Sequence, residues 1–353
     1  MVGGTSELIW YVYPIWHRVS FTLISEKHIE QLKKYFRLYT IDEKAIPNIY
    51  PVTRPLIILH PFFYNMSRIG DRIEHFLSKV KGIIGVDVAD SNSISNLAVS
   101  MTHYAEAMIV PSEWSKRSYI NSGCKTPVYV VPHGLDKTWY ETSSNLQFFD
   151  NIAKYKKDKK KKLLLYFCWH SEYRKGLDLV LKVYETLIRE RKDVSLVAKF
   201  MTQNGYPHMV IRRLGGIIVS GWLTEEQKME LYDLSDIYLL FSRGGAFEHN
   251  GLEAIARNCL VVAARGGAWQ EYLPDFSLVD SRPTKWVLKD NPIHNGGGVE
   301  VIVDKAIDRI HIMLDNLDDY KQKLKDYVEE KIKNIYTWEN AGKKLAQIIR
   351  RYL

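Results

Sequence analysis

Residues 241–267, FSRGGAFEHNGLEAIARNCLVVAARGG, carry the strongest structural signal in the chain. A strand is expected to end at Phe241 and Ser242, a glycine pair follows at Gly244 and Gly245, and a helix is expected from about residue 250. Glycines before a helix N-terminus expose backbone N–H groups, and the helix dipole there favours an anion. The spacing therefore predicts a strand, a phosphate-binding loop and a helix of an α/β domain.

The same alternation continues through the rest of the second half. Apolar, strand-like stretches alternate with helical patterns at 175–191 and 225–234, and the stretches are LLLYFCW (163–169), VSLVAKF (194–200), GGIIVSG (215–221), IYLLFS (237–242) and LVVAA (260–264). Strands that alternate with helices indicate a parallel sheet with both faces covered. We therefore expect a doubly wound, Rossmann-like domain here.

The first half shows the same rhythm. The strand-like stretches are LIWYVYP (8–14), PLIILHPFF (55–63), GIIGVDVA (82–89), AMIVPS (107–112) and PVYVVP (127–132). Helical patterns lie between them, at about 26–36, 68–80 and 94–104 and from residue 113. The fold class expected is α/β, with two Rossmann-like doubly wound domains facing a central cleft.

The length of 353 residues suits two domains of this size. We expect an N-terminal domain over 1–150, a lysine-rich linker over 151–162, a C-terminal domain over 163–335, and a last helix over 336–353 that packs back on the first domain. The linker contains KYKKDKKKK (154–162), and it contributes much of the net charge of +8. A solvated linker is the plain interpretation, and contact with a lipid headgroup is the alternative.

Composition excludes several classes. No apolar run approaches the roughly 18 residues of a membrane span, and Pro14 interrupts the apolar N-terminus, which lacks a basic leader. We expect a cytoplasmic protein, with peripheral membrane contact left open. Its cysteines, Cys124, Cys168 and Cys259, form no Cys-x-x-Cys pair. Nucleic-acid binding is not expected, because the lysines cluster in one segment without interleaved aromatics.

Several ordered motifs resemble the large retaining glycosyltransferase family 4, which has the two-domain GT-B fold. They are VPSEWSKRSYINSGCKTPVYVVPHGLD (110–136), YRKGLDLVLKVYETL (173–187), GWLTEEQKMELYDLSDIYLLFS (221–242), LEAIARNCLVVAARGG (252–267) and YTWENAGKKL (336–345). The resemblance covers the chain from about residue 80 onward. It implies transfer of a sugar from a UDP- or GDP-sugar to a glycan, lipid or protein acceptor, with no cofactor and no metal.

The resemblance also implies roles for residues of the donor domain. Lys175 would bind the donor diphosphate, and Glu253, early in the helix after the glycines, would bind the ribose. Gly245 stands where the family has its first acidic residue, and His170 stands where it has an arginine. Glu248 and Arg174 are the candidates to replace these two groups, and Gly244, Gly245 and His170 line the expected donor loops.

Family members are proposed to let the leaving diphosphate accept the proton of the acceptor hydroxyl. The protein then supplies charge stabilisation, for which Lys175 and Arg174 are placed. On the acceptor side, Asp90 follows the strand of GIIGVDVA and His60 ends LIILH. Both lie at carboxyl ends of expected strands, where ligands of parallel sheets bind, and we expect them to orient the acceptor.

Two other functions fit the same pattern. A sugar-nucleotide epimerase or phosphorylase of this fold would share the phosphate site but needs no separate acceptor of the transferase type. A noncatalytic nucleotide-sugar binding protein would keep the fold without turnover. The retained Glu253 and Lys175 favour the transferase.

Overall fold

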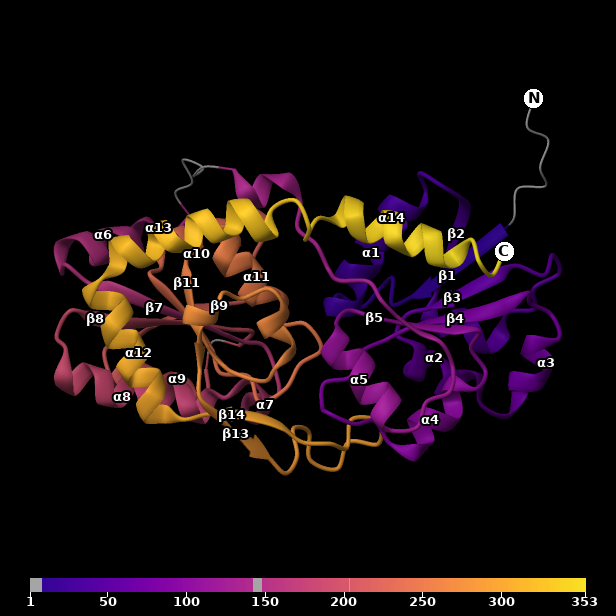
Figure 1. The fold of residues 1–353 in the computed structure, drawn as a ribbon, viewed down its shortest axis with the longest axis horizontal. Helices are drawn as coiled ribbons and strands as arrows, with labels where there is room; N and C mark the ends of the chain where they lie inside the picture. The colour runs from indigo at the N-terminus through magenta and orange to yellow at the C-terminus, as the bar shows by residue number, and fades with distance from the viewer. Residues whose placement is uncertain (1–7, 142–147, 203) are drawn as a thin grey trace. The chain divides into compact units, whose positions relative to one another are not determined.

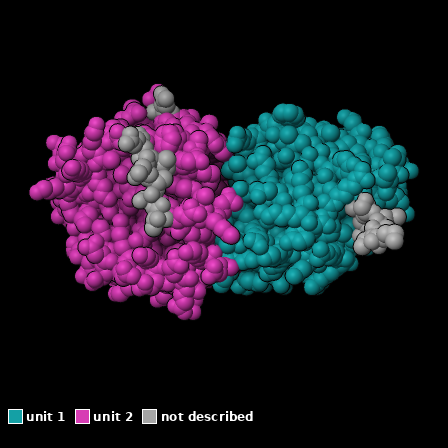
Figure 2. All heavy atoms as spheres, turned by 90° about the horizontal axis from the view of Figure 1, so that it is seen from above, with its two compact units in different colours: residues 1–135, 289–296, 335–353 teal, residues 136–288, 297–334 magenta. Residues whose placement is uncertain are grey.

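The computed structural model describes residues 8–141, 148–202 and 204–353. It divides into two compact units (Figure 2). Unit 1 comprises residues 1–135, 289–296 and 335–353, and unit 2 comprises residues 136–288 and 297–334. Within the described residues, no helix combines the length and apolar character needed to cross a membrane.

Unit 1 is built on a six-stranded parallel sheet in the order β2-β1-β3-β4-β5-β6 (Figure 1). Its strands are β1 (Leu8–Tyr13), β2 (Arg37–Asp42), β3 (Leu56–Leu59), β4 (Gly82–Val86), β5 (Ala107–Val110) and β6 (Val128–Val130). Its helices are α1 (Ser20–Leu32), α2 (Phe62–Ile69), α3 (Ile73–Leu77), α4 (Asn96–Thr102), α5 (Glu113–Asn121) and α14 (Trp338–Ile349).

The alternation of side chains along β3 explains why both faces of this sheet are covered. Leu56 and Ile58 pack in one buried cluster with residues of α1 and α14, whereas Ile57 and Leu59 pack in another with residues of α2 to α5. Because successive side chains of a strand point to opposite faces, an all-apolar strand requires a layer on each side.

Unit 2 contains a second six-stranded parallel sheet, in the order β12-β11-β10-β7-β8-β9. The strands are β7 (Lys162–Cys168), β8 (Val194–Phe200), β9 (Ile217–Ser220), β10 (Ile237–Leu240), β11 (Leu260–Ala264) and β12 (Leu278–Val279), and an antiparallel pair joins β13 (Ser281–Thr284) to β14 (Gly298–Val301). The helices are α6 (Asp150–Asp158), α7 (Glu172–Lys175), α8 (Leu177–Glu190), α9 (Tyr206–Arg213), α10 (Glu225–Leu234), α11 (His249–Ala256), α12 (Val303–Asp315) and α13 (Leu317–Tyr327).

The lysine-rich segment 151–162, expected to be a linker, is largely helical and belongs to unit 2. Its residues form α6 and the first residue of β7, and both belong to unit 2. Ile152 is buried, and Lys156 forms an ion pair of 2.9 Å with the buried Asp236. These two contacts hold one face of α6 against the rest of unit 2, while its other lysines, Lys154 and Lys157, are exposed.

Candidate donor site

The order of the strands in unit 2 fixes where a ligand can bind. The chain runs outward from β7 to β8 and β9 and then returns to place β10 on the other side of β7. In such sheets ligands bind beyond the carboxyl ends of the strands at the point where the order reverses. The loops that follow β7 and β10 therefore form the candidate donor site.

These two loops are joined closely through their backbones. The Arg243 N–H donates a hydrogen bond of 2.7 Å to the Arg174 carbonyl. Gly176 has φ +73°, and a Cβ there would collide with the Phe241 carbonyl. Only a glycine combines this backbone conformation with so close an approach, so Gly176 permits residues 171–175 to lie against residues 241–248.

A buried ion cluster results at the contact. The Lys175 ammonium lies 2.6 and 2.8 Å from the two carboxylate oxygens of Glu248, and Arg174 Nη1 lies 3.4 Å from one of them. Arg174 also donates to the Gly244 carbonyl at 3.3 Å. The side chains of Glu248 and Arg174 are 3% and 9% exposed, so solvent screens the pair weakly. Two cations and one carboxylate leave a net positive charge that suits an anion.

The position of Glu248 has a local cause. It precedes α11 with φ +60° and ψ +67°, a left-handed conformation that is uncommon for a residue with a side chain. Tyr272 donates a hydrogen bond of 2.6 Å to its carbonyl. A Cβ added at Gly245 would collide with the Glu248 carboxylate. The glutamate thus occupies the space into which a side chain at position 245 would project.

Glu253 in α11 lies in a second ion cluster. Its carboxylate is within 2.7 Å of Lys228 Nζ, 3.0 Å of the Tyr232 hydroxyl and 3.1 Å of Asn250 Nδ2. Burial is the largest influence and raises the pKa of Glu253, but the charges of Lys228 and His249 and the hydrogen bonds from Lys228 and Tyr232 together outweigh it, so the pKa lies below its usual value. Glu253 is therefore ionised at neutral pH, with both oxygens already engaged by these side chains.

Two other predicted donor residues lie in the same loops. Gly244 is buried between Arg243 and Gly245, and its carbonyl accepts from Arg174 as described. His170 follows β7 but is exposed, and its Nδ1 lies 2.7 Å from the Ser171 hydroxyl.

In unit 1, His60 lies where the strand order of the sheet reverses, directly after β3. It is 3% exposed, and its Nδ1 lies 2.9 Å from the Tyr11 hydroxyl and 2.8 Å from the Ser25 hydroxyl. Burial, and then the nearby His28, hold the pKa of His60 well below 6.5. His60 is thus a neutral imidazole within a buried network.

The two aspartates after β4 differ in environment. Asp87 is buried, and its carboxylate accepts the backbone N–H groups of Phe63 and Val88, both at 2.8 Å. Burial raises the pKa of Asp87 to about 7 in spite of these bonds. Asp90 is half-buried, and its backbone N–H donates to His294 Nδ1 at 3.4 Å. Asp87 therefore serves the N-terminus of α2, and Asp90 is the more accessible carboxylate.

The sequence patterns did not single out Lys228 and Lys199, which lie near Glu253. Lys228 precedes Tyr232 by four residues in α10, so both side chains lie on one helix face, and this spacing was a usable signal. Lys199 lies inside the apolar strand β8. A lysine in an otherwise largely apolar strand is unusual, and this was the signal that could have identified Lys199. In the described part of the chain, no group of three or more His, Cys, Asp or Glu side chains is arranged to hold a metal.

The chain is similar in sequence to two viral proteins. The chain is 34% identical over 357 aligned positions to "Uncharacterized protein 356" of Sulfolobus islandicus rod-shaped virus 1, covering 98% of this chain and 99% of the viral protein. The chain belongs to the same family as that viral protein. No family model matches the chain. The chain is also 26% identical to "Putative glycosyltransferase 45" of Sulfolobus islandicus filamentous virus, over 74% of this chain and 72% of the other.

Solved structures share the architecture. HepE of Anabaena, in complex with UDP and glucose, matches with a TM-score of 0.73 and 13% identity, over 98% of this chain and all of HepE. Sucrose-phosphate synthase of Thermosynechococcus elongatus matches with a TM-score of 0.71 and 12% identity, over 98% of each chain. The expected α/β fold of the GT-B type, with two Rossmann-like sheets, is thereby confirmed.

Proposed function

We propose that this chain is a glycosyltransferase of the retaining family 4 type, which moves a hexose from a nucleoside-diphosphate sugar to an acceptor hydroxyl. The observation that carries the proposal is the buried cluster of Arg174, Lys175 and Glu248 at the point where the strand order of unit 2 reverses. The fold and the viral relative named a putative glycosyltransferase support it. The HepE complexes, with UDP and glucose and with UDP-glucose, favour UDP over GDP as the donor nucleotide.

In this proposal Lys175 and Arg174 bind the donor diphosphate. The bond between the sugar C1 and the diphosphate oxygen breaks, and negative charge develops on the leaving group. A well-placed cation or N–H donor in such a site is worth about 2.7–4 kcal/mol, or roughly 10²–10³ in rate. Both side chains are largely buried, so solvent screens their charges only weakly, and Glu248 balances one of the two positive charges.

The acceptor hydroxyl attacks C1 on the same face from which the diphosphate leaves. Its proton passes to an oxygen of the departing diphosphate, so no protein base is required and the anomeric configuration is retained. Glu248 would accept hydrogen bonds from hydroxyls of the transferred sugar, and Glu253 from those of the ribose. Asp90 would orient the acceptor hydroxyl, with His60 supporting the acceptor loop as a neutral imidazole. The reaction would use no metal.

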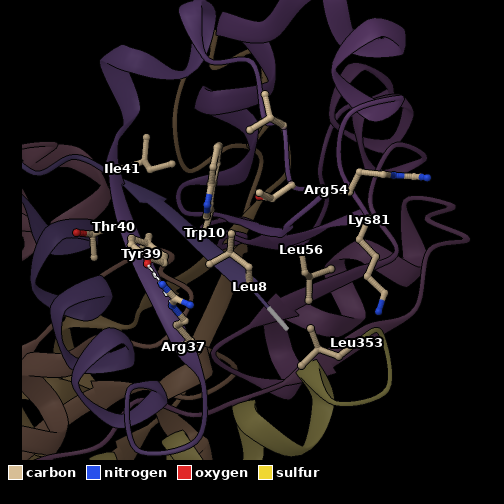
Figure 3. Close-up of a pocket in the computed structure, with 12 residues that line it drawn as sticks. Leu8, Trp10, Arg37, Tyr39, Thr40, Ile41, Arg54, Leu56, Lys81 and Leu353 are labelled. Carbon is tan, nitrogen blue, oxygen red and sulfur yellow. Dashed lines mark hydrogen bonds between the residues drawn. The ribbon is translucent and has the colours of Figure 1, made fainter. Parts of the chain in front are cut away.

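The proposal also includes contact between unit 1 and an anionic membrane surface, where a lipid acceptor would lie. A hollow of about 780 Å³ in unit 1 lies near the amino ends of β1, β2 and β3 (Figure 3). Arg37, Arg54 and Lys81 line it together with Trp10 and other apolar side chains, and its described lining includes no acidic residue. Cations beside apolar groups suit a layer of acidic lipids, which would place the enzyme in the cytoplasm at the membrane.

One experiment separates this function from its alternatives. The purified protein is incubated with UDP- and GDP-sugars, with and without a panel of glycan, lipid and peptide acceptors, and released nucleotide and sugar products are identified. A transferase releases nucleotide and glycosylates an acceptor with retained anomeric configuration. An epimerase converts the sugar nucleotide without an acceptor, a phosphorylase requires inorganic phosphate, and a binding protein gives no product.

A further inference from the structure

Lys199 of β8 is a buried cation without a matching acceptor. The residue is 8% exposed, and its Nζ lies 4.9 Å from the ring centroid of Trp169. Across the described residues it makes no hydrogen bond and no ion pair. Lysines are almost never this buried unless they are paired, so the position points to an oxygen supplied from outside the chain.

The surrounding charges support this interpretation. Burial, and then the charge of Lys228, lower the pKa of Lys199 to about 8, while Glu253 acts in the opposite direction. The Glu253 carboxylate is engaged by Lys228, Tyr232 and Asn250 rather than by Lys199. Lys228 also pairs with Glu225 at 2.7 Å, so Lys228 engages both carboxylates of this cluster, and no carboxylate of the described residues lies within ion-pair distance of Lys199.

Two exposed tryptophans stand beside this cation. Trp169 follows β7 and Trp222 follows β9, and they are 37% and 40% exposed. Their rings are perpendicular, with centroids 5.3 Å apart. Because β7, β8 and β9 are neighbours in the sheet, both rings and Lys199 lie at the same carboxyl edge that carries Lys175 and Glu253.

We propose that Trp169 and Trp222 hold the nucleobase of the donor and that Lys199 donates a hydrogen bond to a carbonyl oxygen of that base. This inference rests on the proposed glycosyltransferase function. Aromatic side chains bind the faces of all bases, so the tryptophans supply affinity. Lysine has three donors and no acceptor. It therefore favours the carbonyl oxygens of uracil and guanine over adenine, whose exocyclic group is an amine donor.

The test is calorimetry with UDP, GDP, ADP and inorganic pyrophosphate on four variants and the unmodified chain. Lys199→Met keeps the apolar stem and removes the ammonium, and its control is Lys182→Met on the exposed side of α8. Trp222→Leu removes one ring, and its control is Trp16→Leu, which changes a residue that is 82% exposed in unit 1. Thermal melts of all five proteins check that each is folded.

We expect the unmodified chain to prefer UDP or GDP to ADP by about tenfold or more, the size of one hydrogen bond to a charged group. Lys199→Met should lose about tenfold in UDP or GDP affinity and most of this preference. Trp222→Leu should weaken all three nucleotides by roughly 5- to 150-fold, the range for one stacked base. Pyrophosphate should bind all five proteins equally, because it reaches only the Lys175 site.

Several results would overturn the inference. Equal UDP affinity in Lys199→Met, Trp222→Leu and the unmodified chain would show that the nucleobase does not bind at this position. The proposed function would not be affected by that result. A loss of pyrophosphate affinity in Lys199→Met as large as the loss of UDP affinity would assign Lys199 to a phosphate instead. Failure of the unmodified chain to bind any of the nucleotides or sugar nucleotides would reject the proposed function itself.

Discussion

Glu248→Gln should raise the affinity for UDP and lower the affinity for a UDP-sugar relative to that for UDP. The substitution keeps the shape of a side chain that is 3% exposed and removes its charge. Lys175 is bound to this carboxylate at 2.6 Å, so a diphosphate must share the ammonium with it. Glutamine would release that competition while losing the charged acceptor proposed for the sugar hydroxyls.

The magnitude follows from the geometry. A diphosphate oxygen on the other side of the Lys175 ammonium would lie about 5 Å from the carboxylate, since each charge-assisted bond is about 2.7–2.9 Å long. At an effective dielectric constant of about 20 the repulsion is about 3 kcal/mol before screening. We expect a net gain of about 1–2 kcal/mol in UDP affinity, or roughly 5- to 30-fold, once solvent is included.

The sugar nucleotide gains from the same loss of repulsion but loses its charged acceptor, which is worth about 1.5–3 kcal/mol. The ratio of UDP-sugar affinity to UDP affinity should therefore fall by roughly 10- to 150-fold. Calorimetry with both ligands measures the ratio. Glu172→Gln changes an exposed carboxylate at the start of α7, is the matched control and should leave the ratio unchanged. An unchanged ratio in Glu248→Gln would show that Glu248 does not touch the sugar.

Lys175→Ala should weaken UDP binding by about 1.5–3 kcal/mol and slow transfer, as calorimetry and initial rates would record, and unchanged values would remove Lys175 from the diphosphate site. Chelator should leave transfer intact, and a loss restored by manganese or magnesium would refute the metal-free mechanism. Gly245→Ala should displace the Glu248 carboxylate and lower UDP-sugar affinity more than UDP affinity in calorimetry, whereas equal losses would argue against that contact. Lys199→Met should raise the free energy of unfolding at pH 7 by about 1–2 kcal/mol after solvent screening. The reason is that the pKa of Lys199 in the folded chain, about 8, lies below the pKa of a lysine in the unfolded chain, so the charged ammonium destabilises the fold. This gain should shrink between pH 8 and 10.5 in denaturant titrations, and a gain that grows with pH would contradict it.

The sequence predicted the central strands of both sheets well. β3 and β10 are entirely apolar because helices cover both faces of a parallel sheet. β2 was missed because it is an edge strand whose residues, RLYTID, are largely exposed and polar. α6 was missed because its lysines resemble a solvated linker and Ile152 alone is buried.

The sequence predicted only the part of the donor site that depends on local patterns. Glycines and acidic residues after a strand are a local pattern, so the loop containing Glu248 could be recognised. The ion pair between Lys175 and Glu248 joins residues 73 positions apart and depends on β7 and β10 being neighbours. Neighbouring strands are a property of the topology, which the local pattern does not contain. Lys199 was missed because strand-like periodicity assigned its segment to the core.

The most direct test of the donor-site assignment is a crystal structure of the chain with UDP bound. We predict the β-phosphate within hydrogen-bonding distance of Lys175 Nζ, beside the loop of Gly244 and Gly245, with Glu248 displaced from the ammonium or sharing it. A nucleotide bound away from the loops that follow β7 and β10, with the Lys175–Glu248 pair intact, would contradict the assignment.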